Sequence, residues 1–284
     1  MLQGAYQSVA KNPPPPEDSL EYLPTILYSA RSFIALNQPD QALSLVSADT
    51  QPAARAIRAL ATYVKTKALG GGVESVVDEL RDLTIEVEGE EEGEQGAGVG
   101  VVRVAAATAF FQEGEVEEAL TTLGAGAGGQ DIEWWVDFIY CSSVGRCSHY
   151  SSSSYLTVQI YLSMNRADLA RKEYMYAKSH DAESLLLQII EASIGLVSGG
   201  ILPLTLNSAS HVYDEQAAAP GSLSNANIIA SKGMANLLQG HHTEAESMFN
   251  EALLVDAKNG DALVGLAVTK QLSAKQKAAD EAFE

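Results

Sequence analysis

The side chains best suited to chemistry gather in residues 125–154, which hold Cys141, Cys147, His149 and the serine run Ser151–Ser154. Two thiols and an imidazole can ligate a metal ion, and a serine beside a histidine can act as a nucleophile when a carboxylate orients the pair. Two cysteines supply only half of a metal site, and no carboxylate is tied to His149 in the sequence. We therefore expect free thiols, as in a reducing compartment, and neither a catalytic site nor a metal site.

Other polar clusters lack the spacing that their chemistry requires. Residues 88–100 carry five glutamates among glycines, without the regular ligand spacing of a calcium loop, so we expect a mobile acidic loop there. His241 and His242 fall in a predicted turn, where a surface position is favoured over metal binding. The glycine-rich stretches lack the lysine and the preceding strand of a phosphate-binding loop, so no cofactor is expected.

Composition narrows the class of protein further. The 284 residues are 46% hydrophobic and only 7% aromatic, which favours close-packed helices. A net charge of −19, from 37 acidic and 18 basic residues, argues against nucleic acid and against direct docking on anionic lipid. No apolar run reaches the length of a membrane span and no signal peptide opens the chain, which predicts a soluble, cytoplasmic protein.

The elements that position these side chains are best defined between Asn227 and Asn259, where two amphipathic helices flank a turn at Leu238-Gln239-Gly240. Gly233 and Ala245 are small where two helix axes approach, and Phe249 is large where a gap between neighbouring helices must be filled. This order of small and large residues is that of a tetratricopeptide unit.

Similar turns recur along the whole chain. They fall at Gly4, Asn37, Gly70, Gly114, Asn165, Gly200, Gly240 and about Ala274, at intervals of 33, 33, 44, 51, 35, 40 and 34 residues. The pattern predicts an all-α fold, a tetratricopeptide-like α-solenoid in which helical hairpins form a right-handed superhelix over residues 1–284. The two long intervals contain the acidic loop 88–100 and an atypical insertion at 125–154.

Two segments depart from the regular pattern, and a regular pair closes the array. Leu2-Gln3-Gly4 repeats the turn tripeptide, so the chain is expected to begin in mid-repeat with Ala5–Lys11 as a second helix that lacks its partner. The insertion, which includes Trp134-Trp135, has three interpretations: an aromatic binding tip, a helical extension, or retained intron sequence; an inserted segment without function is favoured. Leu263–Leu272 and Ala274–Phe283 are predicted as a last helix pair.

A helical superhelix presents a concave surface lined by the first helix of each pair. The candidate partner-binding residues on this surface are largely apolar, which favours a long apolar or helical ligand over a short charged tail. They are Tyr155, Gln159, Leu162, Leu186, Ile189, Leu196, Asn227, Ala230, Met234 and Leu237. Taken singly, each of them is better explained by packing between repeats.

Several segments, taken in their order along the chain, resemble the coatomer epsilon subunit family in a fungal-type version. They are Leu156–Leu162, Asn165–Glu173, His211-Val212-Tyr213-Asp214-Glu215, and Leu238-Gln239-Gly240 followed by Glu244-Ala245-Glu246. The likeness is strongest from Leu156 to Val268, and the chain ends at Glu284, short of the family's usual C-terminal extension.

The resemblance implies a structural subunit of the COPI vesicle coat without enzymatic activity. Its implied partner is the C-terminal domain of the coatomer alpha subunit, with the other coatomer subunits bound indirectly, in Golgi-to-ER and intra-Golgi transport. Membrane contact on the Golgi and on vesicles is then made only through the assembled coat. Two alternatives stay open: a chaperone-type adaptor that binds a client's C-terminal carboxylate through basic inner residues, and an enzyme using Cys141, Cys147 and His149.

Overall fold

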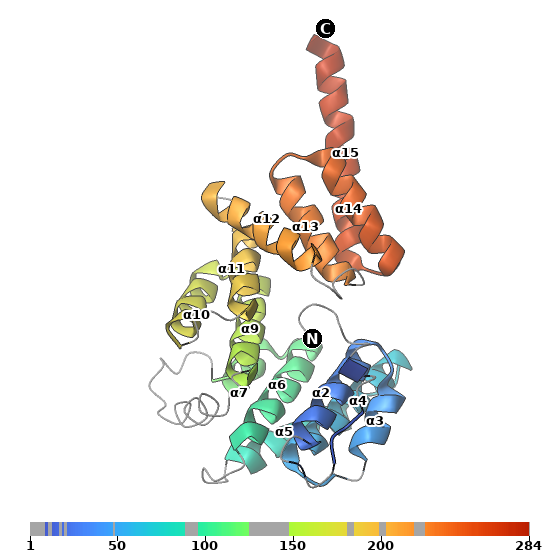
Figure 1. Ribbon diagram of the computed structural model, residues 1–284, viewed down its shortest axis with the longest axis vertical. Coiled ribbons are helices and arrows are strands. Elements are labelled where there is room, and N and C mark those ends of the chain that lie inside the picture. Colours follow the sequence, from blue (N-terminus) through green and yellow to red (C-terminus); the bar gives the residue numbers. More distant parts are fainter. Residues whose placement is uncertain are drawn as a thin grey trace. The chain divides into compact units, whose positions relative to one another are not determined.

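The computed structural model describes residues 9–10, 13–16, 19, 22–47, 49–88, 96–124, 148–180, 185–198, 203–218 and 225–283 (Figure 1). Over these residues the chain forms helices and turns and no strand, which confirms the predicted all-α, solenoid-like class. The helices are α2 (Tyr22–Ala35), α3 (Pro39–Val46), α4 (Pro52–Ala68), α5 (Glu74–Glu88), α6 (Gly96–Glu113), α7 (Val116–Thr122), α9 (Ser148–Ser163), α10 (Ala167–His180), α11 (Leu185–Val197), α12 (Pro203–Ala218), α13 (Ala226–Leu238), α14 (His242–Val255) and α15 (Gly260–Phe283).

The contacts between helices divide the chain into two compact units. One lies within Tyr6–Ala182 and contains α2–α10, and the other contains α11–α15 within Glu183–Glu284. Within each unit, a helix packs against the next one along the chain. The first helices of successive pairs also contact one another, α4 with α6, α6 with α9, and α13 with α15, as expected for stacked hairpins.

The turn inside each well-defined hairpin has one conformation. Asn37, Gly70, Gly114, Asn165 and Gly240 all have positive φ, between 57° and 86°. At Gly240 the amide of the following residue, His241, donates to the Asn236 carbonyl at 2.9 Å, and the Gly240 amide donates to the Leu237 carbonyl at 3.1 Å. This pair of bonds closes the last turn of a helix around a left-handed residue, which explains why glycine or asparagine marks each of these turns.

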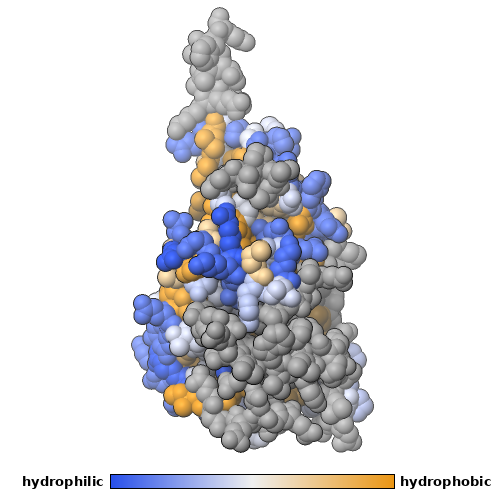
Figure 2. Space-filling view, turned by 90° about the vertical axis from the view of Figure 1, so that its left-hand side faces the viewer, coloured by the Kyte–Doolittle hydropathy of each residue, from blue (hydrophilic) through white to orange (hydrophobic). Residues whose placement is uncertain are grey.

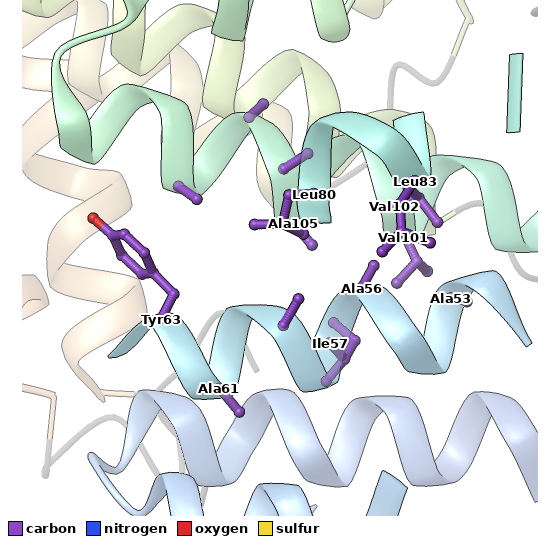
Figure 3. Packing of buried hydrophobic residues seen from close by; sticks show 14 of the residues in the cluster. Ala53, Ala56, Ile57, Ala61, Tyr63, Leu80, Leu83, Val101, Val102 and Ala105 are labelled. Atoms are coloured by element: carbon purple, nitrogen blue, oxygen red, sulfur yellow. The ribbon is translucent and has the colours of Figure 1, made fainter. Parts of the chain in front are cut away.

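The core of the first unit is built around α4. Figure 3 shows α4 side chains, among them Ala56, Ile57 and Tyr63, facing residues from α5 and α6. Ile57 and Tyr63 are essentially inaccessible to solvent, as are Leu80 of α5 and Val102 of α6. Alanines among these larger residues let the helix axes approach closely.

In the second unit, Phe249 of α14 fills the space between α13 and α15. It is fully buried, and a Cβ added at Gly233 would lie 2.9 Å from its ring. A Cβ at Gly265 of α15 would overlap the same ring. The predicted pairing of a small residue with a large one is therefore present, with the ring itself, rather than Ala245, nearest to Gly233.

Two predicted irregular segments are in part helical, and these predictions are corrected. Residues 96–100, expected in the acidic loop 88–100, form the start of α6, because Val101 and Val102 are buried. A Cβ added at Gly98 would lie 3.7 Å from the Ala53 side chain. Residues 148–154, expected in the insertion 125–154, form the start of α9. Ser153 and Ser154 are buried there. Residues 89–95 and 125–147 lie outside the described residues.

The predicted last helix pair is also corrected. α15 runs without a break through Ala274, because this position offers neither glycine nor asparagine to adopt the left-handed turn. The predicted turns at Gly4 and Gly200 lie outside the described residues. Among the described helices, none combines the length and the apolar character needed to span a bilayer.

Candidate partner-binding surface

The candidate residues on α9 are partly accessible. Tyr155 and Gln159 are half-buried, whereas Leu162, one turn further along, is buried. The hydroxyl of Ser154 donates to the Glu173 carboxylate of α10 at 2.9 Å and so ties α9 to the second helix of its hairpin. Of the three candidates on α9, Tyr155 and Gln159 are therefore the accessible ones.

The candidate residues on α11 are divided in the same way. Leu186 is buried, and Leu196 packs against a cluster that includes Tyr213 of α12. The Tyr213 hydroxyl lies 3.2 Å from Ser193 Oγ, and burial raises the pKa of this tyrosine. Ile189 and Leu196 are both half-buried.

On α13 the four candidates differ in exposure. Ala230 is buried, and Met234 and Leu237 pack against the cluster around Phe249. Asn227 is exposed, and its side-chain oxygen accepts a hydrogen bond of 2.7 Å from the amide of Asn259. A partner that contacts α13 therefore meets a polar position held in a fixed orientation.

Of the ten candidates, Asn227 is exposed and six are half-buried: Tyr155, Gln159, Ile189, Leu196, Met234 and Leu237. The three buried candidates, Leu162, Leu186 and Ala230, stabilise the hairpins themselves in this conformation. Sequence spacing assigns a residue to a helix face, but burial depends on which neighbour covers that face. That these ten residues together contact a partner remains a prediction.

Several lysine and arginine side chains form ion pairs. Arg81 of α5 donates to Asp78 and Glu118 at 2.6 Å and to Glu115 at 2.6 Å, joining its hairpin to the next. On the first helix of that hairpin, α4, Lys67 donates to Glu113 at 2.8 Å, and this contact lowers the pKa of the Glu113 carboxyl. These interactions were not predicted, since an arginine near acidic residues is too common in sequences to be informative.

A carboxylate-binding adaptor would need free basic residues on the first helices. α9 and α11 contain no lysine or arginine, and Lys232 of α13 pairs with Asp214 at 3.0 Å. On α4, Arg55 and Lys65 pair with Glu86 and Asp40. On α9, α11 and α13, basic side chains are therefore absent or already paired with a carboxylate.

The groups considered for catalysis do not form a described site. Cys141 and Cys147 lie outside the described residues, and His149 falls in the first turn of α9. Within the part of the chain that the structure describes, no group of three or more His, Cys, Asp and Glu side chains is placed to hold a metal ion.

Repeated helical hairpins with a common left-handed turn define the chain as a tetratricopeptide-like repeat protein. A family model described as "Coatomer epsilon subunit" matches residues 2–135 and 151–283. The chain belongs to the coatomer epsilon subunit family.

Two plant relatives illustrate the distance within the family. The chain is 25% identical over 266 residues to coatomer subunit epsilon-1 of Arabidopsis thaliana, covering 93% of this chain and 78% of that protein. It is 25% identical over 271 residues to coatomer subunit epsilon-1 of Oryza sativa subsp. japonica, covering 93% of this chain and 79% of that protein.

Proposed function

We propose that the protein is a structural, non-enzymatic subunit of the COPI vesicle coat that binds the C-terminal domain of the coatomer alpha subunit. In this role it supports Golgi-to-ER retrograde transport and intra-Golgi transport. The observation that carries the proposal is the family match over nearly the whole chain, on a fold of stacked helical hairpins. The remaining coatomer subunits are bound indirectly.

The accessible faces of the first helices suit a protein ligand. In the first unit, Tyr155 and Gln159 of α9 combine apolar area with hydrogen-bonding groups, and in the second unit Ile189 of α11 offers apolar area. Half-buried side chains of this kind lose little conformational freedom on binding, so more of the free energy gained from burial remains for affinity. The partner therefore contributes a long apolar or helical segment.

Charge supports an indirect relation to the membrane. With a net charge of −19, the chain is repelled by anionic lipid head groups. The protein is then cytoplasmic when free and reaches Golgi and vesicle membranes as a peripheral component of the assembled coat. A charged surface on the alpha subunit that meets this chain is expected to be basic.

The test is co-expression of the full chain with the C-terminal domain of the coatomer alpha subunit, followed by size exclusion. A stable complex with one copy of each is expected. Ile189→Arg, on a first helix, should weaken binding at least tenfold without changing the far-UV circular dichroism spectrum.

The matched control is Ile85→Arg on α5, a second helix, where the isoleucine side chain is 67% exposed. It should leave affinity unchanged. Absence of a complex with the unaltered chain would refute the alpha-subunit partner, and an equal loss with Ile85→Arg would refute the first-helix surface.

A further inference from the structure

The outward face of α10 is basic, in a chain with a net charge of −19. Its exposed residues, three or four positions apart along the helix, are Arg171, Lys172, Met175 and Lys178. Met175 is 65% exposed and lies among the three cations. In Figure 1 α10 is drawn at the left, the side that faces the viewer in Figure 2, and there hydrophilic residues (blue) lie beside hydrophobic ones (orange) at the surface.

The two acidic residues of α10 do not oppose these cations. Asp168, in the first turn, pairs with Arg166 at 3.0 Å. Glu173 accepts a hydrogen bond of 2.9 Å from the Ser154 hydroxyl of α9, and burial raises the pKa of its carboxyl. The outward face of this helix therefore combines positive charge with one apolar side chain.

Part of this face stays at the surface wherever a further hairpin follows in the same unit. The spacing of alanine, aromatic residue and alanine that buries the inner face of α10 is repeated in α14. In this alignment Lys172 corresponds to Ser247 and Met175 to Asn250, and both of these are exposed although α15 packs against α14. Lys172 and Met175 therefore belong to the outer surface of the repeat array.

The outward faces of other second helices carry acidic residues instead. The exposed ones are Asp78, Glu79 and Asp82 on α5, Asp214 and Glu215 on α12, and Glu244 and Glu251 on α14. At physiological ionic strength, charges more than about 8 Å apart are largely screened, so a short ligand responds to the local charge and not to the total. Of these four helices, α10 is the one that attracts an acidic ligand.

The spacing of the cations indicates the form of such a ligand. Arg171 and Lys178 lie seven positions apart, which is about 10 Å along a helix. In an extended peptide, two acidic residues on either side of a central apolar residue, each two positions from it, point to one side and span about 13 Å. Flexible lysine and arginine side chains can meet that separation. The central apolar residue then lies over Met175.

We propose that this face of α10 binds an acidic peptide segment of a partner protein, with carboxylates against Arg171, Lys172 and Lys178 and an apolar side chain on Met175. Lys178 is already oriented, because its Nζ lies 5.2 Å from the centre of the Tyr174 ring and donates to the Tyr174 hydroxyl at 2.9 Å. An anionic membrane fits less well, since an extended bilayer also meets the acidic remainder of the chain.

The test is fluorescence anisotropy of a labelled peptide that contains Glu-Thr-Leu-Thr-Glu and has both termini blocked, titrated with the full chain. A Kd on the order of 100 μM is expected at about 20 mM salt, and binding should weaken several-fold at about 150 mM salt. Lys172→Glu/Lys178→Glu should weaken binding at least about tenfold. Far-UV circular dichroism verifies that this variant is folded, and Lys172→Glu alone serves if it is not.

The matched control is Lys258→Glu/Lys270→Glu, which makes the same change in net charge at two exposed lysines away from α10. It should change the affinity less than about twofold. A second control peptide, with glutamine in place of both glutamates, should not bind.

The proposal is overturned if the acidic peptide does not bind at low salt, if the glutamine peptide binds equally well, or if both double variants lose affinity alike. Two other results would replace the peptide with a different ligand. One is binding to phosphatidylserine vesicles, without peptide binding, that Lys172→Glu/Lys178→Glu abolishes. The other is self-association with the same dependence on these two lysines. Because α10 is a second helix and the probe is not the alpha subunit, the outcome is independent of the function proposed above.

Discussion

Phe249 should be coupled energetically to the glycine opposite it on α15. The ring is fully buried and lies where a Cβ at Gly265 would be placed. Phe249→Ala removes the ring and leaves a cavity, and such changes lower the free energy of unfolding by about 3–5 kcal/mol. Because the ring of this α14 residue packs against both α13 and α15, the change should lower the stability of the whole second unit.

Gly265→Ala acts through the same ring in the opposite sense. An alanine favours the helix by about 1 kcal/mol over glycine, but overpacking a filled core costs about 1–3 kcal/mol. The single variant should therefore lose up to about 2 kcal/mol. Once Phe249 is replaced by alanine, the overlap is gone and the same methyl group should stabilise the unit. The two changes are then non-additive by about 1–3 kcal/mol.

The assay is urea unfolding followed by far-UV circular dichroism, with native-state hydrogen exchange of α13 and α15 amides to report on the second unit alone. Gly260→Ala is the matched control, because a Cβ there meets nothing within 4 Å. Its effect should add to that of Phe249→Ala. If Gly265→Ala and Phe249→Ala also add within about 0.5 kcal/mol, the packing argument is refuted.

Three further changes test the turns and the polar contacts. Gly240→Ala should lower the free energy of unfolding by about 1–2 kcal/mol in urea titrations, because its φ of 83° is unfavourable for residues with a Cβ. Arg81→Gln should lower it by about 1 kcal/mol, less in 1 M salt, since its ion pairs with Glu115 and Glu118 are partly exposed. Burial raises the pKa of the Glu173 carboxyl. The folded state therefore binds this proton more tightly than the unfolded state does. The free energy of unfolding falls as the pH rises from the unfolded pKa through the raised pKa of the folded state. Glu173→Gln should therefore raise Tm at pH 7 to 8, with the gain shrinking near pH 4, and an equal gain at both values would contradict this account.

The turns were the most predictable part of the fold. Asn37, Gly70, Gly114, Asn165 and Gly240 were identified by residue type and spacing, and all have the left-handed conformation. A single backbone angle at one residue ends the helix, and few residue types adopt it without strain. Local chemistry was therefore sufficient at these positions.

Long-range packing set the boundaries that the sequence did not predict. The serine run before Tyr155 is a poor helix former taken alone, yet Ser154 is buried and hydrogen-bonded to Glu173, nineteen residues away in the chain. The glycines at the start of α6 are similarly unfavourable, but Val101 and Val102, which follow them, are buried in the core built around α4. In both places the partner that stabilises the helix is distant in sequence, so local propensity gave the wrong boundary.

The burial of the candidate residues also depends on packing partners that local sequence does not reveal. Spacing correctly placed Leu162, Leu186 and Ala230 on first helices, but it could not tell that their neighbours bury them. At Ala274 the reverse holds, since the repeat period predicted a turn that the residue type does not permit. Where period and turn chemistry disagree, the backbone follows the turn chemistry, because no packing within the chain offsets left-handed strain at alanine.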